Sequence, residues 1–179
     1  MKNELQTERL ILRKMEETDA PALFRIWSDP NVTEFMNISS FTDQSQAKEM
    51  IQILNKLSED NQAIRYSIIG QQRQMIIGSC GFNTFDFNNA RAEIGYDLAK
   101  IYWGQGYAFE SVQALLQYGF HSLQLNRIEA KVEPANTNSI KLLEKLHFTF
   151  EGTLRKYEKS KGHFVDVRMY SLLNNEFIV

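Results

Sequence analysis

A short glycine loop between a strand pattern and a helix pattern constrains this chain more than any other feature. Gly104 and Gly106 lie in the loop, a strand pattern ends at Leu98, and an amphipathic pattern follows from Tyr107. Glycines let a ligand approach the backbone, and the first N–H groups of a helix have no partner inside it. The positive end of the helix dipole adds to these groups, so the loop predicts an anion site, above all for phosphate. A plain glycine turn before a core helix is the alternative.

Two familiar phosphate motifs do not fit this loop. A dinucleotide-binding fingerprint needs a third glycine three residues after the second, where Phe109 stands. A P-loop needs Gly-Lys-Ser/Thr, whereas Gly106 is followed by Tyr107 and Ala108. The ligand must therefore be held by another kind of loop.

Composition predicts one domain over residues 1–179, since 43% hydrophobic and 23% charged residues are typical of a globular protein. A formal net charge of −2 gives no general basic surface for nucleic acid. No apolar stretch has the form of a signal peptide or a membrane span, so we expect a cytoplasmic protein. The single cysteine, Cys80, is interpreted as a reduced core residue rather than a nucleophile. The three histidines have no zinc-like spacing, so no metal is expected.

The periodicity of apolar residues predicts an α/β fold with a mixed sheet, in the order β-α-α-β-β-β-α-β-α-β-β. Strands are expected at residues 9–15, 63–70, 75–85, 91–98, 127–133, 154–159 and 163–173, and helices after Thr18 or Asp19, after Asp43, at 107–122 and at 137–146. Strand 91–98, helix 107–122 and strand 127–133 form a parallel pair with a crossover. Because Pro134 has no N–H, pairing should fail at or near it. The freed backbone groups could bind a slender amide chain such as pantetheine.

The loop resembles the pyrophosphate loop of the GNAT acyltransferase superfamily, (Arg/Gln)-x-x-Gly-x-(Gly/Ala). Gly106 and Ala108 match its last two fixed positions, while Trp103 replaces the leading Arg or Gln. The later run from Pro134 to Ser139 and the run from Leu142 to Phe148 resemble the superfamily's Asn-x-x-Ser helix and its end. The segments Thr7–Arg13, Ala92–Tyr96, Phe148–Arg155 and Val165–Tyr170 resemble the branch that acetylates N-termini of ribosomal proteins.

The resemblance implies direct transfer of acetyl from acetyl-CoA to an amine, without an acyl-enzyme. It assigns the pyrophosphate to backbone N–H groups of the loop and the thioester carbonyl to a freed N–H near Leu98. The implied cofactor-binding residues are Leu98, Trp103, Gly104, Gln105, Gly106, Tyr107, Ala108, Asn136 and Ser139. Asn136 could equally be only a helix cap. Two positions depart from the family pattern: His147 replaces a glycine, and Leu143 replaces the tyrosine that many members use as general acid.

Three side chains are candidates for the catalytic chemistry. Glu93 is the first candidate for a general base, acting through water, with an ion pair to Arg91 or Lys131 as the alternative. Glu158 is the second, where the resemblance places a carboxylate near the amine, and a plain surface charge is its alternative. Ser139 is the candidate for stabilising the departing thiolate, or else it makes only a local backbone bond.

The acceptor is expected to be a protein N-terminus, perhaps that of a ribosomal protein. A peptide α-amine has a pKa of about 8 and lysine one of about 10.4, so the α-amine is more easily neutral at pH 7. Residues 31–42 are either a connector or the wall of an acceptor pocket. Acetylation of a small amine and a non-catalytic acyl-CoA sensor are the alternatives, and a monomer and a homodimer are both compatible with the sequence.

Overall fold

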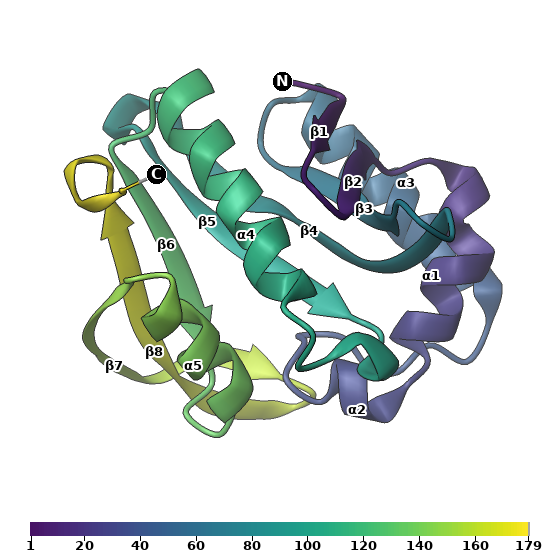
Figure 1. Cartoon of the computed structure of the whole chain (residues 1–179). Helices are drawn as coiled ribbons and strands as arrows, with labels where there is room; N and C mark the ends of the chain where they lie inside the picture. The colour runs from purple at the N-terminus through teal and green to yellow at the C-terminus, as the bar shows by residue number, and fades with distance from the viewer. Residues whose placement is uncertain (179) are drawn as a thin grey trace.

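A single eight-stranded sheet runs through the protein, and a computed structural model describes residues 1–178 of it (Figure 1). The strand order is β1-β2-β3-β4-β5-β6-β8-β7, and β5 and β6 form its parallel pair. The strands are β1 Glu4–Gln6, β2 Leu10–Lys14, β3 Ile64–Gly70, β4 Met75–Asp86, β5 Arg91–Leu98, β6 Arg127–Val132, β7 Thr149–Ser160 and β8 His163–Leu173. The helices are α1 Ala20–Trp27, α2 Pro30–Thr33, α3 Gln44–Glu59, α4 Tyr107–Gln117, which continues as a π-helical turn Tyr118–Ser122, and α5 Thr137–Lys145.

Helices cover both faces of the sheet and divide its core in two. On one face, Val112 and Leu115 of α4 and Leu143 of α5 pack in one cluster with Ile94 and Leu98 of β5. On the other face, α1 and α3 form a second cluster with Met15 and with neighbouring loop residues. The α/β fold with a mixed sheet flanked by helices, predicted from the apolar periodicity, is confirmed.

The element boundaries follow the sequence closely, with two additions. Strand β1 and helix α2 were not expected, because a three-residue strand and a single helical turn carry too little periodicity. Asp29 caps α2 by accepting a hydrogen bond from Asn31 N, and Pro30 is the first residue of this helix. Strand β7 begins at Thr149, five residues before the expected 154.

The parallel strands β5 and β6 separate early. Their register contains three pairs and ends at Glu93 opposite Glu129, well before Pro134. The expectation that pairing fails at or near Pro134 is therefore wrong. The missing N–H of Pro134 is not the cause of the separation, because β6 leaves β5 after Glu129 but stays paired with β8 as far as Val132. Strand β4 instead has an irregularity between Phe82 and Thr84, at the level of Glu93. A bulge bends and twists a strand, which turns β5 away from β6 at this level. Figure 1 shows the tips of the two strands diverging.

Three further findings concern a membrane span, a metal site and the single cysteine. Within residues 1–178 no helix is long and apolar enough to cross a membrane. In the same range no three His, Cys, Asp or Glu side chains are grouped so that they could hold a metal ion. Burial raises the pKa of the Cys80 thiol to about 12, so Cys80 is a neutral core residue, as the sequence predicts.

An ion pair at the closed end of the splay gives a stability prediction. Arg127 of β6 donates two hydrogen bonds to Glu151 of β7, at 2.7 and 2.5 Å, and Ser171 of β8 adds a third. The hydrogen bonds from Arg127 are the main cause that lowers the pKa of Glu151 to about 2. We expect Glu151→Gln to lower the free energy of unfolding by about 1 kcal/mol at pH 7, a modest value because water screens this partly exposed pair.

The sign of the pH dependence follows from the lowered pKa. The contribution of Glu151 is fully present above its unfolded pKa near 4.5 and is lost as the pH falls towards about 2. Denaturant unfolding of wild type and variant should therefore converge over this range. Glu59→Gln, at an exposed carboxylate 3.9 Å from Lys56, is the control and should change little at any pH. A constant difference between wild type and Glu151→Gln down to pH 2 would contradict the assignment.

Candidate active site

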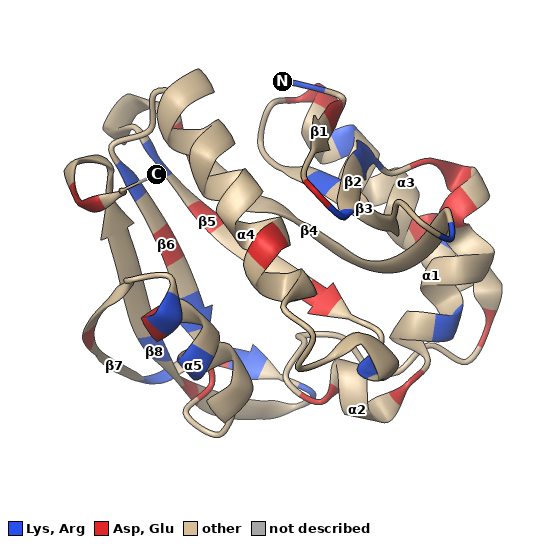
Figure 2. Ribbon diagram, in the orientation of Figure 1, with Lys and Arg blue, Asp and Glu red and all other residues tan. Residues whose placement is uncertain are grey.

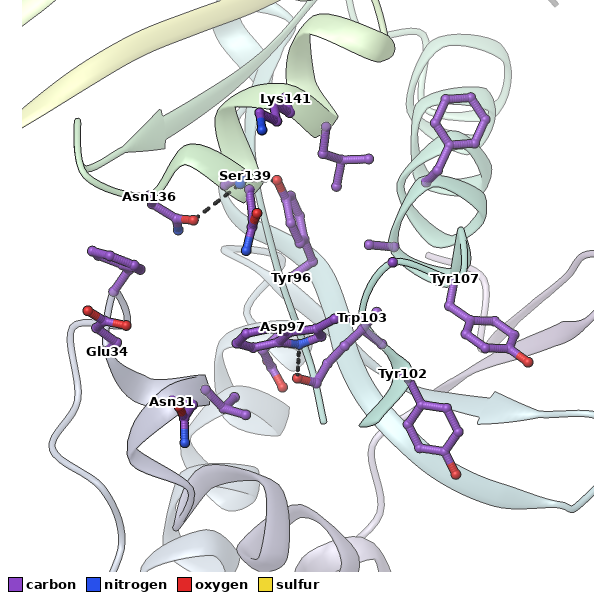
Figure 3. Close-up of a pocket in the computed structure, with 18 of the residues that line it drawn as sticks. Asn31, Glu34, Tyr96, Asp97, Tyr102, Trp103, Tyr107, Asn136, Ser139 and Lys141 are labelled. Carbon is purple, nitrogen blue, oxygen red and sulfur yellow. Dashed lines mark hydrogen bonds between the residues drawn. The ribbon is translucent and has the colours of Figure 1, made fainter. Parts of the chain in front are cut away.

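A cavity of about 480 Å³ opens where β5 and β6 part, and residues from four segments of the chain line it (Figure 3). It is lined by Asn31, Val32, Glu34, Phe35, Met36, Tyr96, Asp97, Leu98, Tyr102, Trp103, Gly104, Gly106, Tyr107, Ala108, Phe109, Asn136, Asn138, Ser139, Lys141, Leu142 and Lys145. The glycine loop, the end of β5 and the start of α5 thus meet in one place, together with α2 and the residues after it.

The end of β5 presents free backbone groups to this cavity. Ala99 N donates to Ile77 O, so Leu98 and Gly78 form a pair that exchanges no hydrogen bonds with each other. The N–H and C=O of Leu98 therefore point away from β4, towards β6, which has already separated. Trp103 Nε1 donates a hydrogen bond to the Leu98 carbonyl oxygen at 2.8 Å. The N–H of Leu98 is left pointing into the gap, where the sequence interpretation needs a donor.

The glycine loop also presents backbone donors. Gly106 has φ 83°, a left-handed conformation that favours glycine, and it is the N-cap residue of α4 with no side-chain cap. The first bond inside α4 runs from Glu110 N to Gly106 O, so the N–H groups of residues 106–109 have no acceptor within the helix. Four free N–H groups at the positive end of an eleven-residue helix form an anion site.

Arg9, almost a hundred residues away in sequence, holds this loop in place. Its Nε donates to Glu110 at 2.6 Å, its Nη1 donates to Gln105 O at 3.1 Å, and its guanidinium lies 4.5 Å from the Tyr107 ring centre. Thr7 Oγ1 donates to the same carboxylate at 2.5 Å. Burial alone would raise the pKa of Glu110, but the hydrogen bonds from Thr7 and Arg9 lower it. The guanidinium thus offsets a negative charge that would otherwise oppose an anion at the helix start.

Helix α5 adds positive charge to the opposite wall. Lys141 and Lys145, one helical turn apart, both line the cavity, and Lys145 Nζ lies 4.8 Å from the Phe109 ring centre. Figure 2 shows basic residues on α5, whereas α4 is nearly free of charge along its length. Two ammonium groups beside free N–H groups suit a ligand that carries several phosphates.

Asn136 and Ser139 stand at the start of α5, beside the strand gap. Asn136 Oδ1 accepts from Ser139 N at 3.2 Å, which caps the helix (Figure 3). Capping still leaves the Asn136 amide group facing the cavity. Ser139 Oγ lies 2.6 Å from the hydroxyl of Tyr96 on β5. Ser139 is thus not confined to a local backbone bond but contacts the strand across the cavity.

On the other face of β5, Asp97 is held in a dense polar network. It accepts from Arg65 Nη2 at 2.7 Å, from Trp27 Nε1 at 3.2 Å and from Ser79, and only 6% of it is exposed. A Cβ on Gly95 would lie 2.6 Å from the Asn83 amide. The space beside Gly95 is therefore filled by side chains that anchor the end of β5.

Three residues proposed from the sequence lie outside the cavity lining. Glu93 is paired with Lys131 at 2.8 Å. Gln105 contributes its carbonyl to Arg9 and its side chain to Ile101 O. Glu158 is half-buried on β7. The other cofactor-binding candidates, from Leu98 and the loop to Asn136 and Ser139, all line the cavity.

A further carboxylate lies at the end of β6. Burial raises the pKa of Glu133; Lys161 opposes this, whereas the negative charges of Glu158 and Glu34 add to it. Glu133 is therefore close to two other carboxylates, and one of these, Glu34, lines the cavity. Lys161 Nζ itself donates to Thr33 O at 2.6 Å and to Glu34 O at 2.8 Å, which ties the β7–β8 hairpin to α2.

Residues 31–36 form the remaining wall. Asn31 and Glu34 add polar groups to it, and Val32, Phe35 and Met36 add apolar ones. Ile38 and Phe41 instead pack against the core under α1. The segment that could have been a connector or a pocket wall is thus divided: its first half lines the cavity and its second half is packed inward.

Free N–H groups at the start of α4, the lysines of α5 and the open edge of β5 together suit a ligand that carries phosphates and an amide chain. A sequence model of the Acetyltransferase (GNAT) domain matches residues 9–149, and the chain belongs to this family. Acetyltransferases of this family use acetyl-CoA.

The chain is similar in sequence and structure to known acetyltransferases over almost its whole length. It is 60% identical to uncharacterized N-acetyltransferase p20 of Bacillus licheniformis, over 97% of each chain. It is 25% identical to the [ribosomal protein uS5]-alanine N-acetyltransferase of Escherichia coli, over 90% of this chain and 86% of that one. The solved structure of RimL, a ribosomal L7/L12 alpha-N-protein acetyltransferase, superposes with a TM-score of 0.85 at 27% identity, covering 93% and 91% of the two chains. RimL in complex with coenzyme A superposes with a TM-score of 0.83. The protein is therefore an N-acetyltransferase.

Sequence reasoning did not single out Arg9, Tyr96, Lys141 or Lys145. Arg9 and Tyr96 lie in segments that were quoted for the resemblance, but no local pattern indicates that they reach the loop or Ser139. Lys141 and Lys145 are four residues apart on α5. The apolar face of that helix packs on the core, and this pattern could have indicated that the two lysines lie on a different face.

Replacing Gly106 with aspartate should weaken CoA binding. The variant places a negative charge beside the phosphates and a side chain on a left-handed residue, so we expect the dissociation constant to rise at least about tenfold in calorimetric titration. Gly162→Asp is the matched control, since Gly162 has a similar φ of 86° but lies in the β7–β8 turn. Equal CoA affinity in both variants would remove the loop from the binding site.

Replacing Arg9 with alanine should also weaken CoA binding, although Arg9 does not line the cavity. The loop loses its hydrogen bond to Gln105 O, and Glu110 loses its charge partner, so we expect an affinity loss of about tenfold. The double variant Arg9→Ala/Glu110→Gln removes the uncompensated charge and should recover part of the affinity, again by calorimetry. No recovery would show that Glu110 does not act on the ligand.

Proposed function

We propose that this N-acetyltransferase transfers acetyl from acetyl-CoA to the α-amine of a protein N-terminus, with a ribosomal protein as the acceptor. The observation that carries the proposal is the gap between β5 and β6, where the Leu98 N–H is free and the phosphate loop lies at one end. The activities named for RimL and for the Escherichia coli relative support an α-amine as acceptor. The acidic residues at the gap favour an acceptor that arrives as a cation.

The ligand would be held along its whole length. Backbone N–H groups of residues 106–109 would bind the pyrophosphate, and Lys141 and Lys145 would bind further phosphate charge. The pantetheine amides would pair with free backbone groups of β5 as a short added strand. The Leu98 N–H would donate to the thioester carbonyl oxygen, on which negative charge develops as the amine attacks.

Direct transfer requires that the amine become neutral and that the thiolate be stabilised. At pH 7 removing a proton costs about 1 kcal/mol for an α-amine and about 4 to 5 kcal/mol for lysine, so a modest base suffices for an N-terminus. We propose Glu158 as this base ahead of Glu93, because Glu93 is occupied by Lys131, whereas the described residues provide no ion-pair partner to Glu158. Ser139 would donate a hydrogen bond to the sulfur as the C–S bond breaks.

The proposal is tested by the release of free CoA thiol over a panel of acceptors. The panel contains peptides that begin with Ala or Ser, the same peptides N-terminally blocked with one free lysine, and small polyamines. We expect the free N-terminal peptides to be preferred by at least about tenfold in kcat/KM. Preference for polyamines would show that the acceptor is a small amine rather than a protein N-terminus. Tight CoA binding without turnover for any amine would favour a sensor module.

The choice of base has its own measurement within the same assay. Glu158→Gln should slow turnover most at low pH, where neutral amine is scarcest, by about 10²-fold or more. Glu93→Gln should have a small effect that does not depend on pH. A large effect of Glu93→Gln at low pH, together with a small effect of Glu158→Gln, would show that Glu93 is the base.

A further inference from the structure

The Tyr96 hydroxyl contacts the proposed thiolate-stabilising residue, Ser139. Tyr96 lies on β5 with its side chain on the α4–α5 face, and its hydroxyl is 2.6 Å from Ser139 Oγ on α5. Both residues line the cavity, and Figure 3 shows the Tyr96 side chain reaching up to Ser139. The contact joins elements 43 residues apart.

The direction of this hydrogen bond decides what Ser139 can do. If Ser139 donates to Tyr96, its proton is engaged and cannot reach a ligand. If Tyr96 donates, Ser139 keeps its own O–H free. A phenol is the stronger acid and an aliphatic hydroxyl the better acceptor, so the second direction is favoured.

The surroundings of the phenol keep it a donor. Burial raises the pKa of Tyr96 to about 12, although the hydrogen bond with Ser139 lowers it in part. The phenol is therefore protonated throughout the pH range in which an amine would react. Leu143, where other family members carry a tyrosine, is buried and has no polar group. In this chain a hydroxyl reaches the first turn of α5 from the strand instead.

We propose that Tyr96 is a positioning residue that orients the Ser139 hydroxyl towards the sulfur of CoA. This inference rests on the proposed function. As the C–S bond breaks, sulfur takes the electron pair and accepts a hydrogen bond from Ser139, while Tyr96 donates to Ser139 Oγ. No proton leaves Tyr96, and the thiolate takes up the proton that the amine nitrogen has released.

The first measurement needs no acceptor. The thiol of bound CoA is titrated by its ultraviolet thiolate absorbance in wild type, Tyr96→Phe, Ser139→Ala and the double variant. A hydrogen bond to the thiolate lowers the thiol pKa below the free value, so wild type should show the lowest pKa. The three variants should all shift upwards to the same value, because the phenol acts through the serine.

The second measurement is turnover with the best amine of the acceptor panel. Tyr96→Phe should lower kcat by up to about tenfold, the effect of one hydrogen bond, with the KM for acetyl-CoA changed less than about twofold. The double variant should be no slower than Ser139→Ala. Tyr118→Phe is the matched control, since it removes the hydroxyl of a buried tyrosine that accepts from Lys2 N outside the cavity.

Two results would overturn the inference. One is a Tyr96→Phe variant that folds, binds CoA and keeps the wild-type thiol pKa and kcat. The other is a double variant whose losses multiply, which would mean that the residues act independently. Failure of the proposed function is distinct, because wild type would then acetylate no N-terminal peptide while the thiol titration would still report on Tyr96.

Discussion

The parting of β5 from β6 is the constraint on which the rest of this structure depends. Three residue pairs hold the strands together, and beyond Glu93 each strand keeps only its outer neighbour. Buried backbone groups without partners are costly, so such an opening persists only where something else satisfies them. Trp103 binds one carbonyl of the open edge. The N–H of the same residue remains for a ligand.

Both sides of the opening are held by contacts from distant parts of the chain. Arg65 and Trp27 fix Asp97 at the end of β5, and the ion pair of Arg127 with Glu151 joins β6 to the hairpin beyond it. Arg9 braces the loop that follows β5. The gap is therefore a rigid feature of the sheet, which suits a site that works mainly through backbone donors already in place.

The charge distribution divides the cavity into two functional ends. Lysines of α5 and the free N–H groups of α4 make one end suitable for phosphates. Glu34 after α2, Glu133 after β6 and Glu158 on β7 make the other end suitable for an ammonium group. The reacting centre that we propose lies between them, where Tyr96 contacts Ser139 and Leu98 also lines the cavity. In the proposed reaction, a thioester bound at one end would meet an amine drawn to the other.

The sequence alone determined the elements and the family. Periodicity located β5 and β8 to the residue, the glycine spacing predicted a loop before a helix whose first N–H groups are free, and the motifs from Pro134 to Phe148 identified the superfamily, because these signals are local. The tertiary structure alone decided where the strands part, since that depends on a bulge at Asn83 in the neighbouring strand. It also decided that Glu93 pairs with Lys131, that Arg9 reaches the loop and that Tyr96 reaches Ser139. Such contacts join residues far apart in the chain, and no pattern within one segment records them.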